Sequence, residues 1–125
     1  MILGVGLDVV ETARIARALA LHGRRFEERV YTAAELAQCA ERLDRAQALA
    51  GRFAAKEALL KALGTGSARG ISFLQVEVIR QDGGSAAMSL TGSAAAEARR
   101  RGVQHVHLSL SHQPGLAAAV VILEG

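Results

Sequence analysis

Residues 52–64 place the strongest constraint on how this chain can fold. At about 100° per residue, the alanines, leucines and Phe53 of this stretch cover almost the whole circumference of a helix, which is typical of a helix buried on most sides. Glu57 and Lys61 lie four residues apart and share one narrow polar stripe, while Lys56 falls on a separate edge. A carboxylate on a buried helix needs a cation or hydrogen-bond donors, because desolvating a charge is costly. The stretch therefore predicts a central helix with one charged stripe.

Two interpretations of that stripe are open. Glu57 and Lys61 can form an ion pair within the helix, which is worth only about 0.3–0.5 kcal/mol at a helix surface. The use of lysine favours a chemical role, since the chain has 15 lysines and arginines but its only lysines are Lys56 and Lys61. A compact ammonium suits a phosphate or a proton transfer in a different way from a planar guanidinium.

The opening segment, residues 1–10, reads as a buried strand that ends at Asp8 or just after it. Gly4 and Gly6 occupy alternate positions and leave one face of this strand without side chains. We therefore expect the central helix, or a neighbouring chain, to approach the strand backbone closely on that face.

The remaining pattern predicts helices and antiparallel hairpins around the central helix. Thr32 and Glu35 have the spacing of a capping box, which predicts a helix that runs to about Leu49 and is separated from the central helix by Gly51. The sequence thus predicts one α+β domain over residues 1–125, with a mostly antiparallel sheet wrapped around a central buried helix. The other expected elements are helices over 12–21 and 93–101 and strands over 73–80, 86–90, 103–111 and 116–123.

Composition limits the class of protein. A chain of 125 residues with 50% hydrophobic residues suffices for one core, and because aromatics are only 3%, oligomerisation is a natural supplement. No apolar run is long enough to span a membrane and the N-terminus has no signal-peptide pattern, which predicts a cytoplasmic protein that does not bind membranes. Cys39 is the only cysteine, so an internal disulfide is excluded. The net charge of +3 favours a polyanionic partner: nucleic acid, a phosphorylated metabolite or an acidic protein.

Three segments carry polar groups that local structure does not require. These are Asp8 at a strand end, Glu57 with Lys61 on the central helix, and residues 109–112 at the entrance to a turn. If the first strand packs on the central helix, Asp8 and Glu57 converge. Two carboxylates without histidine or cysteine form a hard oxygen site that suits Mg²⁺, and Lys61 then lies against a bound phosphate.

These segments together resemble a known family. The motifs are Gly-Leu-Asp-Val-Val-Glu at 6–11, Arg-Phe-Ala-Ala-Lys-Glu-Ala at 52–58 with Lys61 and Gly-Thr-Gly at 64–66, and Ser-Leu-Ser-His at 109–112. In this order they closely resemble the holo-[acyl-carrier-protein] synthases, the short group of the 4′-phosphopantetheinyl transferases. The resemblance covers nearly the whole chain and implies a homotrimer with active sites between subunits.

The resemblance implies that 4′-phosphopantetheine passes from coenzyme A to a serine of apo acyl carrier protein in fatty acid biosynthesis, releasing adenosine 3′,5′-bisphosphate. Asp8 and Glu57 are then the Mg²⁺ ligands, and Lys61 adds a second cation. The proton acceptor is either Glu57 or a water held by the ion. By the same likeness the residues that bind the cofactor are Arg52, Lys61, Gly64, Thr65, Gly66, Ser111 and His112.

Acyl carrier proteins are acidic, and the family docks them on a basic helix. The matching residues here are Arg14, Arg17, Arg24 and Arg25. Three other hypotheses compete with this one: another Mg²⁺-dependent phosphotransfer enzyme acting on a different carrier, a small nucleic-acid-binding module, and a non-catalytic trimeric scaffold. Few aromatics are available for base stacking and no nucleic-acid motif is present, so we expect no nucleic-acid partner.

Overall fold

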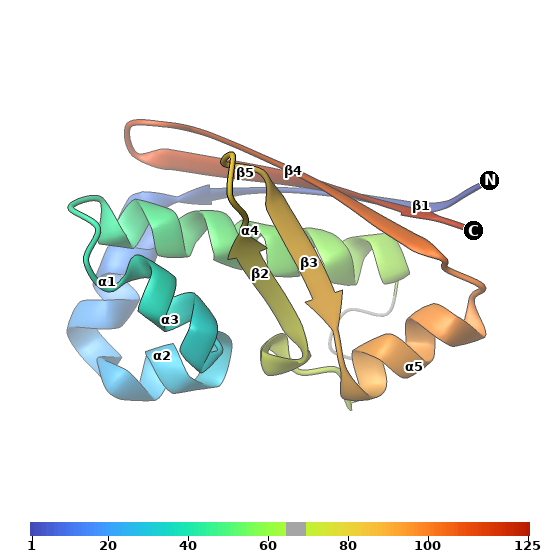
Figure 1. Cartoon of the computed structure of the whole chain (residues 1–125). Coiled ribbons are helices and arrows are strands. Elements are labelled where there is room, and N and C mark those ends of the chain that lie inside the picture. The colour runs from blue at the N-terminus through green and yellow to red at the C-terminus, as the bar shows by residue number, and fades with distance from the viewer. Residues whose placement is uncertain (65–69) are drawn as a thin grey trace.

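Helix α4 (Arg45–Leu63) is the centre of the computed structural model, which describes residues 1–64 and 70–125. Figure 1 shows α4 running beneath the long strands, with the shorter helices gathered at its two ends. Side chains from all round the helix, including Leu49, Phe53, Leu59 and Leu63, are at most 5% exposed. The predicted central buried helix is therefore confirmed.

In the described residues the strands form two antiparallel sheets instead of one. β1 (Ile2–Glu11), β5 (Leu116–Glu124) and β4 (His105–Gln113) make a three-stranded sheet in the order β1-β5-β4. β2 (Val76–Arg80) and β3 (Ala86–Leu90) form a separate hairpin. The first sheet covers one side of α4 and the hairpin lies against another (Figure 1). The α+β prediction with antiparallel pairing holds.

The glycines of β1 let the strand lie directly on α4. A Cβ built at Gly4 would lie 2.2 Å from the carbonyl oxygen of Ala62, and one at Gly6 would lie 1.8 Å from that of Ala58. No real side chain fits at such distances, so the predicted close approach is confirmed and α4 is the element that makes it. Asp8 is the next residue on the same face of β1, because side chains alternate along a strand.

Several expected boundaries were wrong. The capping box of Thr32 and Glu35 is present, but its helix α3 (Ala33–Cys39) ends well before Leu49. The chain turns at residues 40–44, where Arg42 donates to both carboxylate oxygens of Asp44 at 2.8 and 2.9 Å, and α4 begins at Arg45. Gly51 therefore lies inside α4, since one glycine costs a helix only about 1 kcal/mol, which the packing of its neighbours outweighs.

Two further elements differ from expectation. The arginine-rich residues after α1 (Thr12–His22) form a helix, α2 (Arg24–Val30), that the sequence analysis did not predict. The strand expected from residue 73 starts at Val76, because Ser72 and Gln75 cap a short 3₁₀ turn, η2 (Phe73–Gln75). α5 (Gly92–Arg100) lies within one residue of its predicted range. Among the described residues, no helix is both long and apolar enough to cross a membrane.

Candidate active site

Asp8 and the polar stripe of α4 meet at the contact between β1 and α4. Lys61 Nζ donates to Asp8 Oδ1 at 3.1 Å and to the carbonyl oxygen of Leu7 at 2.9 Å. The Asp8 side chain is 16% exposed and that of Lys61 is 55% exposed. In the described part of the chain Lys61 thus pairs with the opening strand, and the interpretation as an ion pair with Glu57 was wrong.

Glu57 lies close enough to Asp8 for the two charges to interact. Partial burial raises the pKa of the Glu57 carboxyl, and the negative charge of Asp8 raises it further. The positive charges of Arg14 and Lys61 act in the opposite direction on the same pKa. Asp8 and Glu57 therefore place two negative charges close together in a partly desolvated region. Such a region favours the binding of a cation.

This pair of carboxylates fits a magnesium ion. Within residues 1–64 and 70–125, no cluster of three or more histidine, cysteine, aspartate or glutamate side chains has the geometry of a metal centre. Mg²⁺ does not need one, since it is commonly held by one or two carboxylates, with water and substrate phosphates at its other positions. The donor set of Asp8 and Glu57 is of that type.

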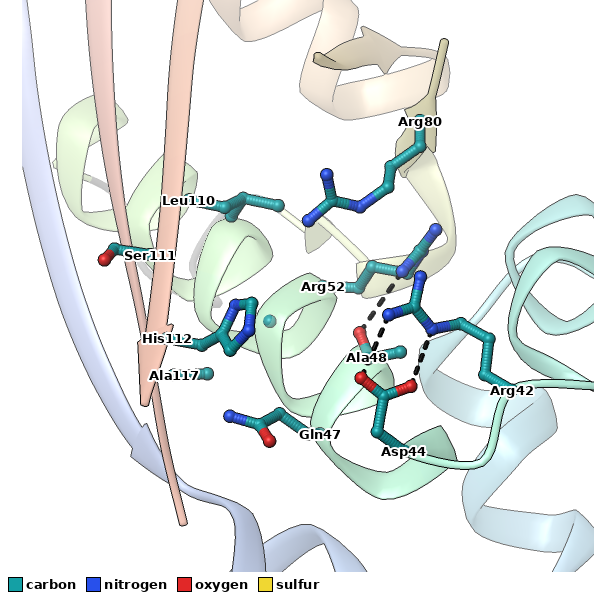
Figure 2. Close-up of a pocket in the computed structure, with 11 residues that line it drawn as sticks. Arg42, Asp44, Gln47, Ala48, Arg52, Arg80, Leu110, Ser111, His112 and Ala117 are labelled. Carbon is teal, nitrogen blue, oxygen red and sulfur yellow. Dashed lines mark hydrogen bonds and ion pairs between the residues drawn. The ribbon is translucent and has the colours of Figure 1, made fainter. Parts of the chain in front are cut away.

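A second group of predicted residues lines a cleft on another side of α4. This small cleft, of about 30 Å³, contains Arg52, Ser111 and His112 together with Arg42 and Arg80. Figure 2 shows His112 extending from β4 into the cleft, while the hydroxyl of Ser111 points away from it. Arg42 and Arg80 were not predicted, because they come from a turn and a hairpin that nothing in the sequence connects to His112.

Arg52 is the most constrained of these residues. It is 3% exposed, and its guanidinium donates to Gln38 Oε1 at 2.7 Å and to the carbonyl oxygens of Val78 and Ala48 at 3.2 and 3.3 Å. Arg42 is tied to Asp44, which holds the pKa of that aspartate below its usual range. Asp44 also lines the cleft and offsets the charge of Arg42, so the positive charge available to a phosphate group comes from Arg52 and Arg80.

The two groups of residues lie on opposite sides of one subunit. At about 100° per residue, Lys61 comes out on the opposite side of α4 from Arg52. Asp8 is on β1 and His112 is on β4, the two edge strands of the sheet, with β5 between them. Two strand spacings amount to about 10 Å. A single chain thus places its carboxylate pair and its arginine cleft at different edges.

The end of α4 was also predicted to bind the cofactor. Gly64 ends the helix in the left-handed conformation, with φ 73° and ψ 8°, and its N–H donates to the carbonyl oxygens of Leu60 and Lys61. The guanidinium of Arg101 lies beside it, with Nη2 3.5 Å from where a Cβ would be. Thr65 and Gly66 lie outside the described residues.

Two of the four arginines predicted to dock a carrier protein lie beside an aromatic patch. The Arg14 guanidinium lies 5.1 Å from the centroid of the Phe53 ring, and that ring lies 5.5 Å from the Phe73 ring. Arg25 lines a cavity of about 480 Å³ beside this patch, while Arg17 and Arg24 are exposed on α1 and α2. The other residues that line the cavity come from three separate elements, so no single sequence pattern predicted them: His22, Phe26, Arg29, Val30 and Phe73.

Comparison with known proteins identifies the family. The model of the 4′-phosphopantetheinyl transferase superfamily matches residues 4–121. The chain belongs to this superfamily. A holo-[acyl-carrier-protein] synthase from Anaeromyxobacter dehalogenans is 53% identical, over 100% of this chain and 98% of that protein.

Solved structures of this superfamily have the same fold. The crystal structure of a holo-[acyl-carrier-protein] synthase from Neisseria meningitidis matches with a TM-score of 0.91 and 32% identity, and both chains are covered completely. The Helicobacter pylori synthase in complex with coenzyme A matches with a TM-score of 0.84 and 29% identity, over 96% of this chain and 99% of that one. The predicted fold and the assignment to a family of transferases are therefore confirmed.

Proposed function

We propose that this protein transfers 4′-phosphopantetheine from coenzyme A to a serine of apo acyl carrier protein in fatty acid biosynthesis. The products are holo carrier protein and adenosine 3′,5′-bisphosphate. The observation that carries the proposal is the meeting of Asp8, Glu57 and Lys61 at the contact between β1 and α4, in a chain that matches synthases along its whole length. We further propose that residues 1–125 form one transferase domain. The cytoplasmic location expected from the sequence remains a prediction.

The proposed reaction exchanges one phosphorus–oxygen bond for another. The serine oxygen bonds to the phosphorus that carries the pantetheine arm, and the bond from that phosphorus to the nucleotide bisphosphate breaks. Asp8 and Glu57 are the residues that would hold Mg²⁺, which when bound offsets negative charge on the pyrophosphate. The ammonium of Lys61 adds a second positive charge at the same place. Glu57 is the proposed proton acceptor for the serine hydroxyl, because its carboxylate lies at the same place as Asp8 and Lys61.

The arginine cleft is the proposed site for the nucleotide end of coenzyme A. Arg52 and Arg80 supply positive charge, and His112 faces them from β4. We retain Ser111, Gly64, Thr65 and Gly66 as proposed cofactor contacts. Coenzyme A is bound in the related Helicobacter pylori structure.

Two observations support a homotrimer with the site between subunits. The carboxylate pair and the arginine cleft lie at opposite edges of one sheet, so a neighbouring copy packed against one edge can bring its own cleft to this chain's carboxylate pair. The outer face of β1 also carries Val5, Leu7 and Val9, which are 59%, 60% and 55% exposed. An apolar strand face of this kind is unfavourable in water and marks a protein contact.

Leu7→Glu is expected to break this assembly, because it places a charge in the centre of the exposed apolar face. Sedimentation velocity should give about three times 13.1 kDa for the wild type and close to 13.1 kDa for the variant. Leu43→Glu is the matched control, since Leu43 is fully exposed on the turn between α3 and α4. A wild-type protein that sediments as a monomer at assay concentration contradicts the proposed trimer.

Mass spectrometry of carrier proteins tests the proposed function. Several apo carriers, including one from fatty acid synthesis and one from a polyketide assembly line, are incubated with the protein, coenzyme A and Mg²⁺. The expected result is a gain of one phosphopantetheine on the fatty-acid carrier. Transfer only to another carrier replaces the proposed substrate, and no transfer to any carrier refutes the proposal.

The double variant Arg14→Ala/Arg25→Ala is expected to raise the KM for carrier protein about tenfold. Both arginines lie beside the aromatic patch and the 480 Å³ cavity, where they match an acidic carrier surface. The difference from wild type should shrink as salt is added, because exposed charges are screened. Arg99→Ala, on the exposed surface of α5, is the control. Equal KM values for the two variants would show that the carrier docks elsewhere.

A further inference from the structure

The buried ion pair between Glu35 and Lys56 is the feature of the core that the proposed chemistry does not use. Both side chains are 0% exposed, and Lys56 Nζ lies 2.7 Å from Glu35 Oε1. Glu35 also accepts from the N–H of Thr32 at 2.8 Å and, through Oε2, from the N–H of Val78 at 2.8 Å. The charge of the carboxylate is therefore fully satisfied inside the protein.

The Lys56 ammonium joins segments that are remote in sequence. Besides Glu35 it donates to the carbonyl oxygens of Val30, Phe73 and Val76, at 2.7, 3.0 and 2.7 Å. These acceptors are the last residue of α2, the first residue of η2 and the first residue of β2. One side chain of the central helix thus holds two separate segments of backbone, the end of α2 and residues 73–76.

Both segments contribute to the walls of the 480 Å³ cavity beside the docking arginines. Val30 and Phe73 both line it, and the carbonyl oxygens of both residues bind the same ammonium. The Phe73 ring packs on the Phe53 ring, and the Arg14 guanidinium lies over the Phe53 ring. The cavity walls and the aromatic patch are therefore set relative to α4 through Lys56.

Stability alone does not explain this arrangement. A buried ion pair loses so much hydration that apolar residues of similar size are often as stabilising. A hydrogen-bonded lysine keeps several carbonyl oxygens at a fixed distance from the helix. An apolar side chain cannot do this. The next residue along α4 is Glu57, so the same turn of helix carries the carboxylate of the proposed active site.

We propose that Lys56, held in place by Glu35, is a positioning residue that fixes the carrier-docking cavity relative to Glu57. The inference rests on the proposed function, since it takes the cavity as the place where carrier protein binds. Neither side chain touches a substrate. Their effect is expected to be largest on carrier binding and smaller on coenzyme A, because β2, which the pair holds through Val76 and Val78, also carries Arg80 of the arginine cleft.

The double variant Glu35→Gln/Lys56→Met tests this proposal. It removes both charges while the side chains keep similar volumes. The carbonyl oxygens of Val30 and Phe73 then lose the ammonium that binds them. The KM for carrier protein should rise about tenfold or more, while kcat and the KM for coenzyme A change by about threefold or less. The matched control is Glu27→Gln/Arg45→Met. It removes a 2.9 Å ion pair that also joins α2 to α4, but neither residue lines the cavity.

Two results overturn the proposal. One is an unchanged KM for carrier protein in the folded double variant. The other is an equal loss in all three kinetic constants, which indicates general loosening of the core. If the double variant does not fold, Glu35→Asp alone serves, since it keeps both charges but moves the carboxylate away from Lys56 by one methylene group. It should raise the KM for carrier about threefold, and a wild-type KM contradicts the proposal.

Hydrogen–deuterium exchange separates this inference from the proposed function. In the double variant, exchange should increase in residues 26–31 and 71–76 and stay unchanged in residues 2–11. A wild-type protein that transfers no phosphopantetheine refutes the proposed function, while the exchange pattern still reports whether Lys56 holds the cavity walls. Equal exchange in variant and wild type at those two segments removes the positioning role.

Discussion

Glu57→Gln is expected to fold normally and to lose phosphopantetheine transfer by about a thousandfold or more. The amide matches the carboxylate in size but carries no charge. It therefore removes one of the two anionic groups proposed to hold Mg²⁺, and also removes the proposed proton acceptor. Because Glu57 is only partly buried and the burial disfavours its charge, neutralising it should not destabilise the protein.

The measurement is the rate of mass gain by apo acyl carrier protein at saturating coenzyme A, with Mg²⁺ varied. Circular dichroism and sedimentation check that the variant has the wild-type fold and assembly. Glu28→Gln is the control, since Glu28 is exposed on α2 and makes only a loose ion pair with Arg24, at 3.9 Å. A Glu57→Gln enzyme with the wild-type rate and the wild-type response to Mg²⁺ shows that the metal assignment is wrong.

Gly6→Ala is expected to destabilise the fold by about 3 kcal/mol or more. Its Cβ would lie 1.8 Å from the carbonyl oxygen of Ala58, and that atom belongs to the backbone of the central helix. Neither partner is a flexible side chain that can move aside, so β1 must separate from α4. Because β1 carries Asp8, transfer should fall together with stability.

Gly51→Ala is the matched control on the same helix. Nothing lies within 4 Å of a Cβ at Gly51, which is inside α4, so alanine should stabilise the protein by about 0.5–1 kcal/mol. Urea unfolding at one fixed protein concentration gives both values, since assembly makes stability depend on concentration. If the two alanine variants are equally stable, the packing of β1 on α4 is not as described.

Patterns within single segments predicted a large part of this fold. The apolar circumference of residues 52–64 predicted the central helix, and Gly4 with Gly6 predicted the bare face of β1. The helix boundaries near Cys39 and Arg45 were missed, because alanine-rich sequence continues on both sides of the turn. α2 was missed for a related reason, since a short arginine-rich run has no apolar periodicity to mark it as a helix.

The two lysines show the limit of what local sequence patterns can predict. Both stand on α4 and the sequence singled out both for chemistry, yet Lys56 is fully buried in a hydrogen-bonded network and Lys61 reaches Asp8. Their spacing on the helix wheel shows that they point in different directions. It does not show that Lys56 contacts Glu35 and three carbonyl oxygens, or that Lys61 contacts β1.

The amino-acid sequence by itself determined the central helix, the alternate glycines of the first strand, the acidic and basic residues available for chemistry and the family to which they point. All of these depend on spacing along one segment. Only the tertiary structure decided that Lys61 pairs with Asp8, that Lys56 holds the walls of a cavity, and that the carboxylate pair and the arginine cleft lie at opposite edges of one sheet. These features depend on distances between segments far apart in the chain, and such distances are set by how α4 packs against every other layer.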